Sequence, residues 1–164
     1  MKDVIPSLFQ KYKQKGILID TNILLLWFVG TTNRNRISQF NRTEKFKPED
    51  YDLLLGILSY FDKIVTTPNI LTEVNSLANQ LGEPERALCL SAFAKAMELL
   101  NESYLESREV VKTNSFTKFG LTDCAIVNIA RDKYLVVTDD LKLAHYLQNI
   151  EIDTINFNNI RVYG

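Results

Sequence analysis

The chain has 164 residues, 46% of them hydrophobic, which suffices for one domain with a substantial core and argues against two independent domains. The formal net charge of -1 and the pI near 5.9 lack the basic excess that marks many nucleic-acid-binding proteins, so charge has to be examined locally. The two cysteines, Cys89 and Cys124, form no C-x-x-C pair, which argues against a disulfide framework and a zinc site.

The amino-terminal residues 1–15 contain no apolar stretch of the signal-peptide type, and the apolar run at 23–29 is far too short to cross a bilayer. We therefore expect no membrane partner. The two isolated cysteines fit a reducing compartment, and a cytoplasmic location is expected.

The first expected elements are an amphipathic helix at 4–15, a buried strand at 17–19 and a helix whose apolar run covers 23–29. Gly16 frees the chain to enter the strand. Asp20 stands where this strand ends and the second helix begins. The carboxyl ends of strands are where ligands and catalytic groups gather in open α/β sheets.

The next segment, up to Pro48, is polar and locally basic. It contains Phe40 and Phe46 as candidate stacking rings for nucleic-acid bases. Two interpretations have equal weight: a solvated loop, or a segment that contacts RNA, since a loop this long is often functional. The candidate RNA-binding residues are Arg34, Arg36, Arg42, Lys45 and Lys47.

Helices and strands alternate in the rest of the chain. The patterns predict helices at 48–62, 68–81, 84–104, 121–133 and 141–149, strands at 64–67, 134–138 and 152–157, and a loop at 108–120. Thr67 and Thr122 are expected to be helix N-caps. No further element is expected after residue 157. This order predicts an α/β/α sandwich, a single domain over residues 1–164 with a mostly parallel sheet of four or five strands.

Four acidic residues fall on the strand-end side of their elements: Asp20, Glu73, Asp123 and Asp140. Each alone has an ordinary explanation as a turn former, a surface acid or a helix cap. Together at one edge they would repel one another unless protons or cations neutralised them. Oxygen ligands without a His or Cys cluster favour Mg²⁺ or Mn²⁺. Two such ions, about 3.5–4 Å apart, can activate a water and stabilise the leaving oxygen in phosphodiester hydrolysis.

The motifs IDTNILL (19–25), PNILTEV (68–74), LTDCAIVNIA (121–130) and VVTDDLKLA (136–144) resemble, in order and spacing, those of PIN-domain nucleases, a family that includes VapC-type toxin ribonucleases. The resemblance covers nearly the whole chain. It implies a catalytic, metal-binding quartet at Asp20, Glu73, Asp123 and Asp140, supported by Asn22 and Thr138. The family's T-x-D pattern selects Asp140 as the fourth acid, while the adjacent Asp139 is an alternative metal ligand.

This resemblance implies a Mg²⁺- or Mn²⁺-dependent endoribonuclease that acts on RNA. It further implies a homodimer and the toxin role of a toxin–antitoxin pair, with an antitoxin protein as partner. The chain is longer than the small toxins usually are, which weakens the toxin assignment more than the nuclease one.

Three other functions are consistent with parts of the sequence. A Cys124 nucleophile would need a base, and the single histidine, His145, lies in a separate helix. A phosphatase or phosphorelay domain also carries strand-end acids, but Asp20 is followed by Thr-Asn without a second Asp, and no lysine follows the last apolar strand. The main alternative is a non-catalytic PIN-like module that binds RNA or protein.

Overall fold

The computed structural model describes residues 3–161, and all of its strands belong to one parallel sheet. The strands are β1 (Ile17–Ile19), β2 (Ile64–Thr66), β3 (Leu100–Glu102), β4 (Leu135–Thr138) and β5 (Thr154–Asn156), in the spatial order β3-β2-β1-β4-β5. In register, Leu18 of β1 lies between Val65 of β2 and Val136 of β4. The predicted α/β/α architecture with a parallel sheet is confirmed.

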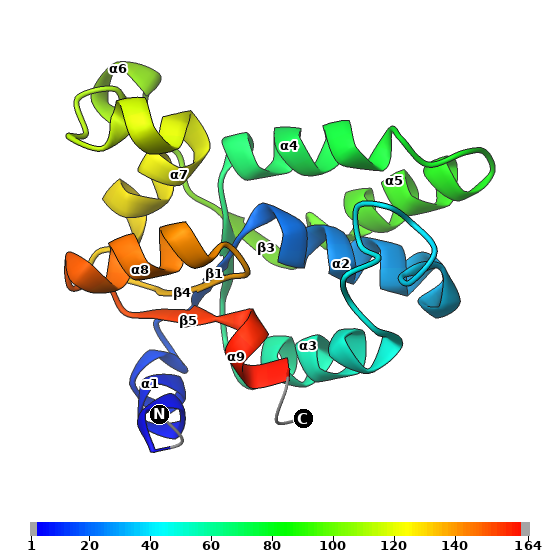
Figure 1. Ribbon diagram of the computed structural model, residues 1–164, viewed down its shortest axis with the longest axis horizontal. Helices are drawn as coiled ribbons and strands as arrows, with labels where there is room; N and C mark the ends of the chain where they lie inside the picture. Colours follow the sequence, from blue (N-terminus) through cyan, green and yellow to red (C-terminus); the bar gives the residue numbers. More distant parts are fainter. Residues whose placement is uncertain (1–2, 162–164) are drawn as a thin grey trace.

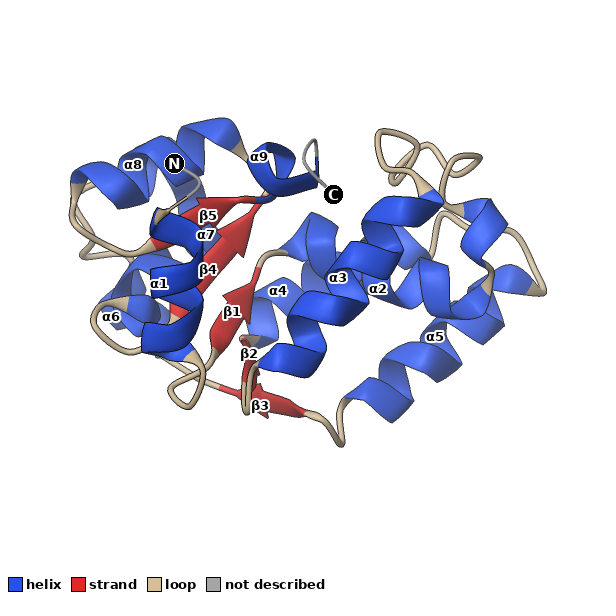
Figure 2. Ribbon diagram, turned by 90° about the horizontal axis from the view of Figure 1, so that it is seen from below, coloured by secondary structure: helices blue, strands red, loops and turns tan. Residues whose placement is uncertain are grey.

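Helices cover both faces of this sheet (Figures 1 and 2). They are α1 (Val4–Tyr12), α2 (Thr21–Thr32), the 3-10 helix η1 (Arg34–Arg36), α3 (Pro48–Tyr60), α4 (Pro68–Ala78), α5 (Glu85–Ala96), α6 (Ser107–Val110), α7 (Phe116–Ala130), α8 (Leu141–Asn149) and α9 (Phe157–Arg161). α1 and α3 lie on one side, and α4 and α7 lie on the other. In residues 3–161 no helix is both long and apolar enough to span a membrane.

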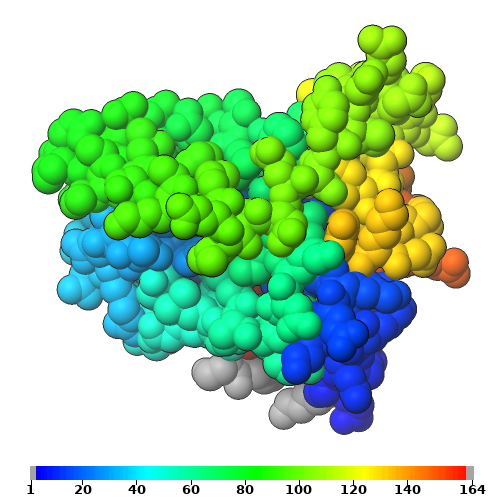
Figure 3. All heavy atoms as spheres, turned by 180° about the vertical axis from the view of Figure 1, so that it is seen from behind, coloured from blue at the N-terminus to red at the C-terminus, as the bar shows by residue number. Residues whose placement is uncertain are grey.

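The core is centred on β1, β4 and α2. The three residues of β1 and the four of β4 are buried, as expected for central parallel strands. α2 is apolar on nearly all sides because it contacts α3, α4 and α5 around it. On the face seen in Figure 3, α4 and α5 form a ridge, and a notch separates this ridge from the α6 segment.

Three predictions about secondary structure were wrong. The helix expected at 84–104 ends at Ala96. Leu100–Glu102 instead forms the edge strand β3, which is held in place by its pairing with β2. The region 108–120, expected to be a loop, contains α6 and the start of α7. Residues after 157, expected to carry no further element, form α9.

The direction of the connections reverses between β1 and β4. From β1 the chain proceeds outward to β2 and β3, whereas β4 is followed by β5 on the opposite side. A crevice forms outside the carboxyl ends of strands at such a switch point, because the helices that follow the two strands diverge. Asp20 follows β1 and Asp139 follows β4, so the topology alone brings acidic residues to this crevice.

Candidate metal centre

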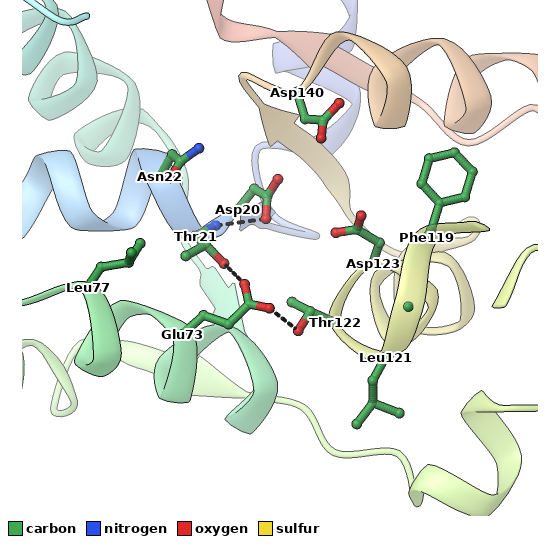
Figure 4. A pocket seen from close by; sticks show the side chains of 11 residues that line it. Asp20, Thr21, Asn22, Glu73, Leu77, Phe119, Leu121, Thr122, Asp123 and Asp140 are labelled. Atoms are coloured by element: carbon green, nitrogen blue, oxygen red, sulfur yellow. Dashed lines mark hydrogen bonds between the residues drawn. The ribbon is translucent and has the colours of Figure 1, made fainter. Parts of the chain in front are cut away.

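A cavity of about 450 Å³ opens at this switch point (Figure 4). All four predicted acids line it, each from a different part of the chain. The residues that line it are Asp20, Thr21, Asn22, Glu73, Leu77, Phe119, Gly120, Leu121, Thr122, Asp123 and Asp140. The structure therefore brings together the acidic quartet that the sequence predicted.

Asp20 is the most enclosed of the four acids, with only 7% of its surface exposed. Its Oδ1 accepts a hydrogen bond from the backbone N–H of Thr21 at 2.7 Å, and its Oδ2 accepts one from the Thr138 hydroxyl at 2.6 Å. The pKa of Asp20 is nevertheless raised to about 6. Burial is the main cause and the charges of Asp139 and Glu73 add to it, while the two hydrogen bonds act in the opposite direction.

Glu73 on α4 is held by two hydroxyl groups. Its Oε2 accepts a hydrogen bond from Thr21 Oγ1 at 2.8 Å, and its Oε1 accepts one from Thr122 Oγ1 at 2.6 Å (Figure 4). These bonds join α4 to α2 and α7 at the cavity. The prediction that Thr122 caps a helix was wrong, because the helix starts earlier and the hydroxyl is used by Glu73.

Asp123 points into the cavity from α7. Its carboxylate accepts no hydrogen bond from any residue within 3–161. Burial raises its pKa to about 7, with further contributions from the negative charges of Asp20, Asp140 and Glu73. Asp123 is thus a half-buried carboxylate that faces three others and has no hydrogen-bond or ion-pair partner in the described part of the chain.

The position of Asp123 depends on a break in α7 at Gly120. This residue has φ 82° and ψ −172°, a backbone conformation that is essentially restricted to glycine. The sequence placed the helix start at Leu121, close to this break, but gave no sign that the preceding turn is also helical. Phe119, directly before the break, and the turn carrying Asp123, directly after it, line the same cavity.

Asp140 and Asp139 have different surroundings although they are adjacent. Asp140 lines the cavity and caps α8, where its Oδ1 accepts hydrogen bonds from the backbone N–H groups of Lys142 and Leu143. Asp139 pairs with Lys45 and accepts a hydrogen bond from Asn22 Nδ2 at 3.2 Å. Of the two candidates for the fourth ligand, Asp140 is the one at the cavity.

The two predicted supporting residues contact the acids. Thr138 Oγ1 donates to Asp20 and accepts from the backbone N–H of Asp140 at 3.0 Å, so it bridges the ends of β1 and β4. Asn22 lines the cavity and donates to Asp139. Thr21 is a further supporting group that the sequence analysis did not identify; its place directly after Asp20 was the available signal.

The carboxylate oxygens of the cavity fit a hard divalent cation, although these side chains do not all point at one position. Among residues 3–161, no three His, Cys, Asp or Glu side chains lie close enough together to hold a metal ion as they stand. The cavity supplies only oxygen ligands from its acids, as Mg²⁺ and Mn²⁺ prefer. The raised pKa values of Asp20 and Asp123 mean that their ionised forms are disfavoured here, and a bound cation would stabilise those forms.

The basic residues of 34–47 differ in their surroundings. Arg34 pairs with Asp52 and Arg36 with Glu85, and neither lines the acidic cavity. Lys47 is exposed. In contrast, Arg42 and Lys45 line a second cavity of about 320 Å³, which shares Asn22 and Leu77 with the acidic one.

The suggestion that Phe40 and Phe46 stack on bases was wrong. Both rings are buried, at 3% and 1% exposure, and Phe46 packs edge-on against Phe157. A buried ring has no free face for a nucleobase. These rings anchor the basic segment to the core.

The cysteine alternative is not supported by the geometry. Cys124 is fully buried beside Ser115, and burial raises the pKa of its thiol, whereas His145 is exposed on α8. A thiol nucleophile needs a base within hydrogen-bond reach and access to substrate. Cys124 has neither of these.

Comparison with protein-family models, curated proteins and solved structures finds no match to the chain.

Proposed function

We propose that this protein is a divalent-metal-dependent endoribonuclease of the PIN-domain type. The observation that carries the proposal is the single cavity at the β1/β4 switch point, lined by Asp20, Glu73, Asp123 and Asp140. Its carboxylates face one another, and no lysine, arginine or histidine is among the described residues that line it. Two of the carboxylates have pKa values raised to about 6 and about 7. The motif resemblance to PIN-domain nucleases selects the same four residues.

The acids would hold Mg²⁺ or Mn²⁺, which would supply the activation of water and the neutralisation of the leaving oxygen in phosphodiester hydrolysis. The protein orients its ligands beforehand: Thr138 and the Thr21 N–H fix Asp20, and two threonine hydroxyls fix Glu73. No covalent intermediate is expected, because no cysteine, histidine or lysine is among the described residues that line the cavity.

The RNA backbone would be held by Arg42 and Lys45, which line the adjoining cavity. Both side chains are exposed, and phosphate groups are the natural partners of such cations next to an acidic metal site. Arg34 and Arg36 contribute less in this arrangement, because neither of them lines the acidic cavity or the adjoining one.

The family resemblance extends the proposal to a homodimer and to a toxin role with an antitoxin partner. Co-purification of a second small protein with the chain from its own cells would support that role.

Cleavage of a labelled RNA by purified protein tests the proposal. Wild type should cut with Mg²⁺ or Mn²⁺ and not with EDTA, and Asp20→Asn should reduce cleavage by at least about 100-fold. Asp62→Asn removes an exposed carboxylate just before β2, at the end of the sheet opposite the cavity, so it is the matched control and should cut normally. Equal cleavage by Asp20→Asn and wild type would refute the proposal. Metal binding without cleavage would favour the non-catalytic module.

A further inference from the structure

The last described helix, α9, contacts both sides of the ion pair between Lys45 and Asp139. Arg161 Nη1 donates a hydrogen bond to the main-chain carbonyl of Lys45 at 2.7 Å, and Asn158 Nδ2 donates one to the main-chain carbonyl of Asp139 at 2.9 Å. The helix begins directly after β5, the strand that pairs with β4 (Figure 1). α9 therefore fixes the main chain of the lysine that lines the adjoining cavity and the main chain of the acid that pairs with this lysine.

Arg161 is itself anchored in the fold. The same Nη1 atom donates to Oδ2 of Asp50 at 3.0 Å, and this oxygen also accepts a hydrogen bond from the backbone N–H of Lys47. The guanidinium group lies 5.3 Å from the centroid of the buried Phe46 ring, and this ring packs edge-on against Phe157 at the start of α9. The end of the basic segment is therefore held against α9 by polar and by aromatic contacts.

Lys45 is the member of this network that is open to a ligand. Arg161 and Asn158 are not among the described residues that line the acidic cavity or the adjoining one, whereas Lys45 lines the adjoining cavity and its side chain is 47% exposed. An ammonium group has three N–H donors, so an ion pair with one carboxylate leaves at least one donor for a phosphate oxygen. An effect of α9 on RNA binding would therefore act through Lys45.

We propose that Arg161 and Asn158 are positioning residues for RNA binding: they hold the two sides of the Lys45–Asp139 ion pair, so that the Lys45 ammonium group meets a phosphate of the RNA bound at the acidic cavity. The inference rests on the proposed nuclease function and adds two residues that act on the RNA only through Lys45. A lysine side chain has many rotamers, and fixing it before the RNA arrives lowers the entropic cost of binding.

Binding of a fluorescent 12-nucleotide single-stranded RNA in Mg²⁺, measured by anisotropy, tests the proposal. All variants are made in the Asp20→Asn background, which removes cleavage during the measurement. Lys45→Gln should weaken binding about 3-fold to 10-fold and should make log Kd less dependent on log salt concentration by about 0.7, the value for one phosphate contact with a single strand. Arg161→Gln and Asn158→Ala should each weaken binding by at least about twofold and also reduce the salt dependence.

Asn158→Ala is the most direct of these variants, because it changes no charge. A neutral substitution reduces the salt dependence when it displaces a charged group that contacts phosphate. Combining Asn158→Ala with Lys45→Gln should bring no further loss of affinity, because the two changes remove the same contact. Urea unfolding shows whether each variant is folded under the assay conditions, and Asn158→Ala alone decides the question if Arg161→Gln is not.

Two control variants separate positioning from general damage. Asn159→Ala removes an exposed asparagine from the next position of α9, and this residue lines neither of the two cavities. Arg131→Gln removes one positive charge and, as at Arg161, a hydrogen bond to a main-chain carbonyl, here that of Ile150. Arg131 precedes β4, at the end of the sheet opposite the cavity. Both controls should bind RNA and respond to salt as the parent does.

Three results would overturn the proposal: normal binding by Lys45→Gln, normal binding by the folded α9 variants, or losses from Asn158→Ala and Lys45→Gln that add in full. The nuclease proposal fails on a different measurement, the metal-dependent cleavage by wild type. Cleavage by wild type together with unchanged RNA binding by the α9 variants would therefore reject only the positioning role.

Discussion

Asp20 and Asp139 are equally buried, at 7% exposure each, and lie at the ends of the two central strands. Their surroundings differ. Asp139 is paired with the Lys45 ammonium group and the Asn22 amide, whereas Asp20 receives two neutral hydrogen bonds and faces other carboxylates across the cavity. The pKa of Asp20 is raised to about 6, largely by burial.

The comparison separates two uses of a buried acid. At Asp139 the protein supplies the compensating cation itself, so the residue joins the basic segment to the end of β4. Around Asp20 the protein gathers further acids in place of a cation. Uncompensated charge is costly to the fold, and we interpret its retention as a requirement of the proposed metal site.

The largest effect should come from removing charge at Asp123. Asp123→Asn should reduce RNA cleavage by at least about 100-fold under the nuclease proposal and yet stabilise the metal-free protein at pH 8. The free energy of unfolding should rise by on the order of 2–3 kcal/mol. Each unit by which the pKa is raised corresponds to about 1.4 kcal/mol, and the total is reduced because the half-buried carboxylate is partly solvated. Urea unfolding in EDTA measures it.

The sign of the pH dependence follows from the raised pKa. Asp123 has a pKa of about 7 in the folded protein against an ordinary value of 3.8, so between these limits the folded state binds more protons than the unfolded one. Wild-type stability should therefore fall as the pH rises from about 4 to about 7. The advantage of Asp123→Asn should shrink at pH 5, and a variant no more stable than wild type at pH 8 would contradict the argument.

The next effect concerns the backbone that presents Asp123. Gly120→Ala should cost about 2 kcal/mol, because φ 82° and ψ −172° are strained for any residue with a Cβ. Gly56→Ala is the matched control: both sites have open space for a Cβ, but Gly56 lies inside α3, where alanine should stabilise by about 0.5–1 kcal/mol. Thermal or urea unfolding of both variants shows whether the changes have opposite signs.

The sequence predicted the strand-end acids better than the helix-borne ones. Asp20 and Asp140 follow buried apolar runs, and local pattern alone places such residues at the edge of a parallel sheet. The expected cap at Thr67 is confirmed, since its hydroxyl accepts a hydrogen bond from the backbone N–H of Ile70. These features depend on residues close together in the chain.

Features that depend on distant pairing were missed. β3 has no apolar alternation and exists because Leu100 pairs with Ile64, and the hydroxyl of Thr122 is used by Glu73, 49 residues away. The sequence showed that the segment is locally basic. It did not show that Asp52 and Glu85 form ion pairs with two of its arginines, because periodicity does not reveal contacts between distant residues. Phe119 was overlooked because its segment was expected to be a loop.

The smallest effect should come from the compensated acid. Lys45→Gln leaves the Asp139 carboxylate, whose side chain is 1% exposed, with the Asn22 amide as its remaining side-chain partner, and should cost about 1 kcal/mol. The cost stays below that of breaking a fully buried pair, because Lys45 is 47% exposed and regains water. A double-mutant cycle with Asp139→Asn should give a coupling of about 1 kcal/mol in urea unfolding. Zero coupling would mean that Lys45 does not compensate Asp139, and the contrast with Asp20 would then rest on the facing acids alone.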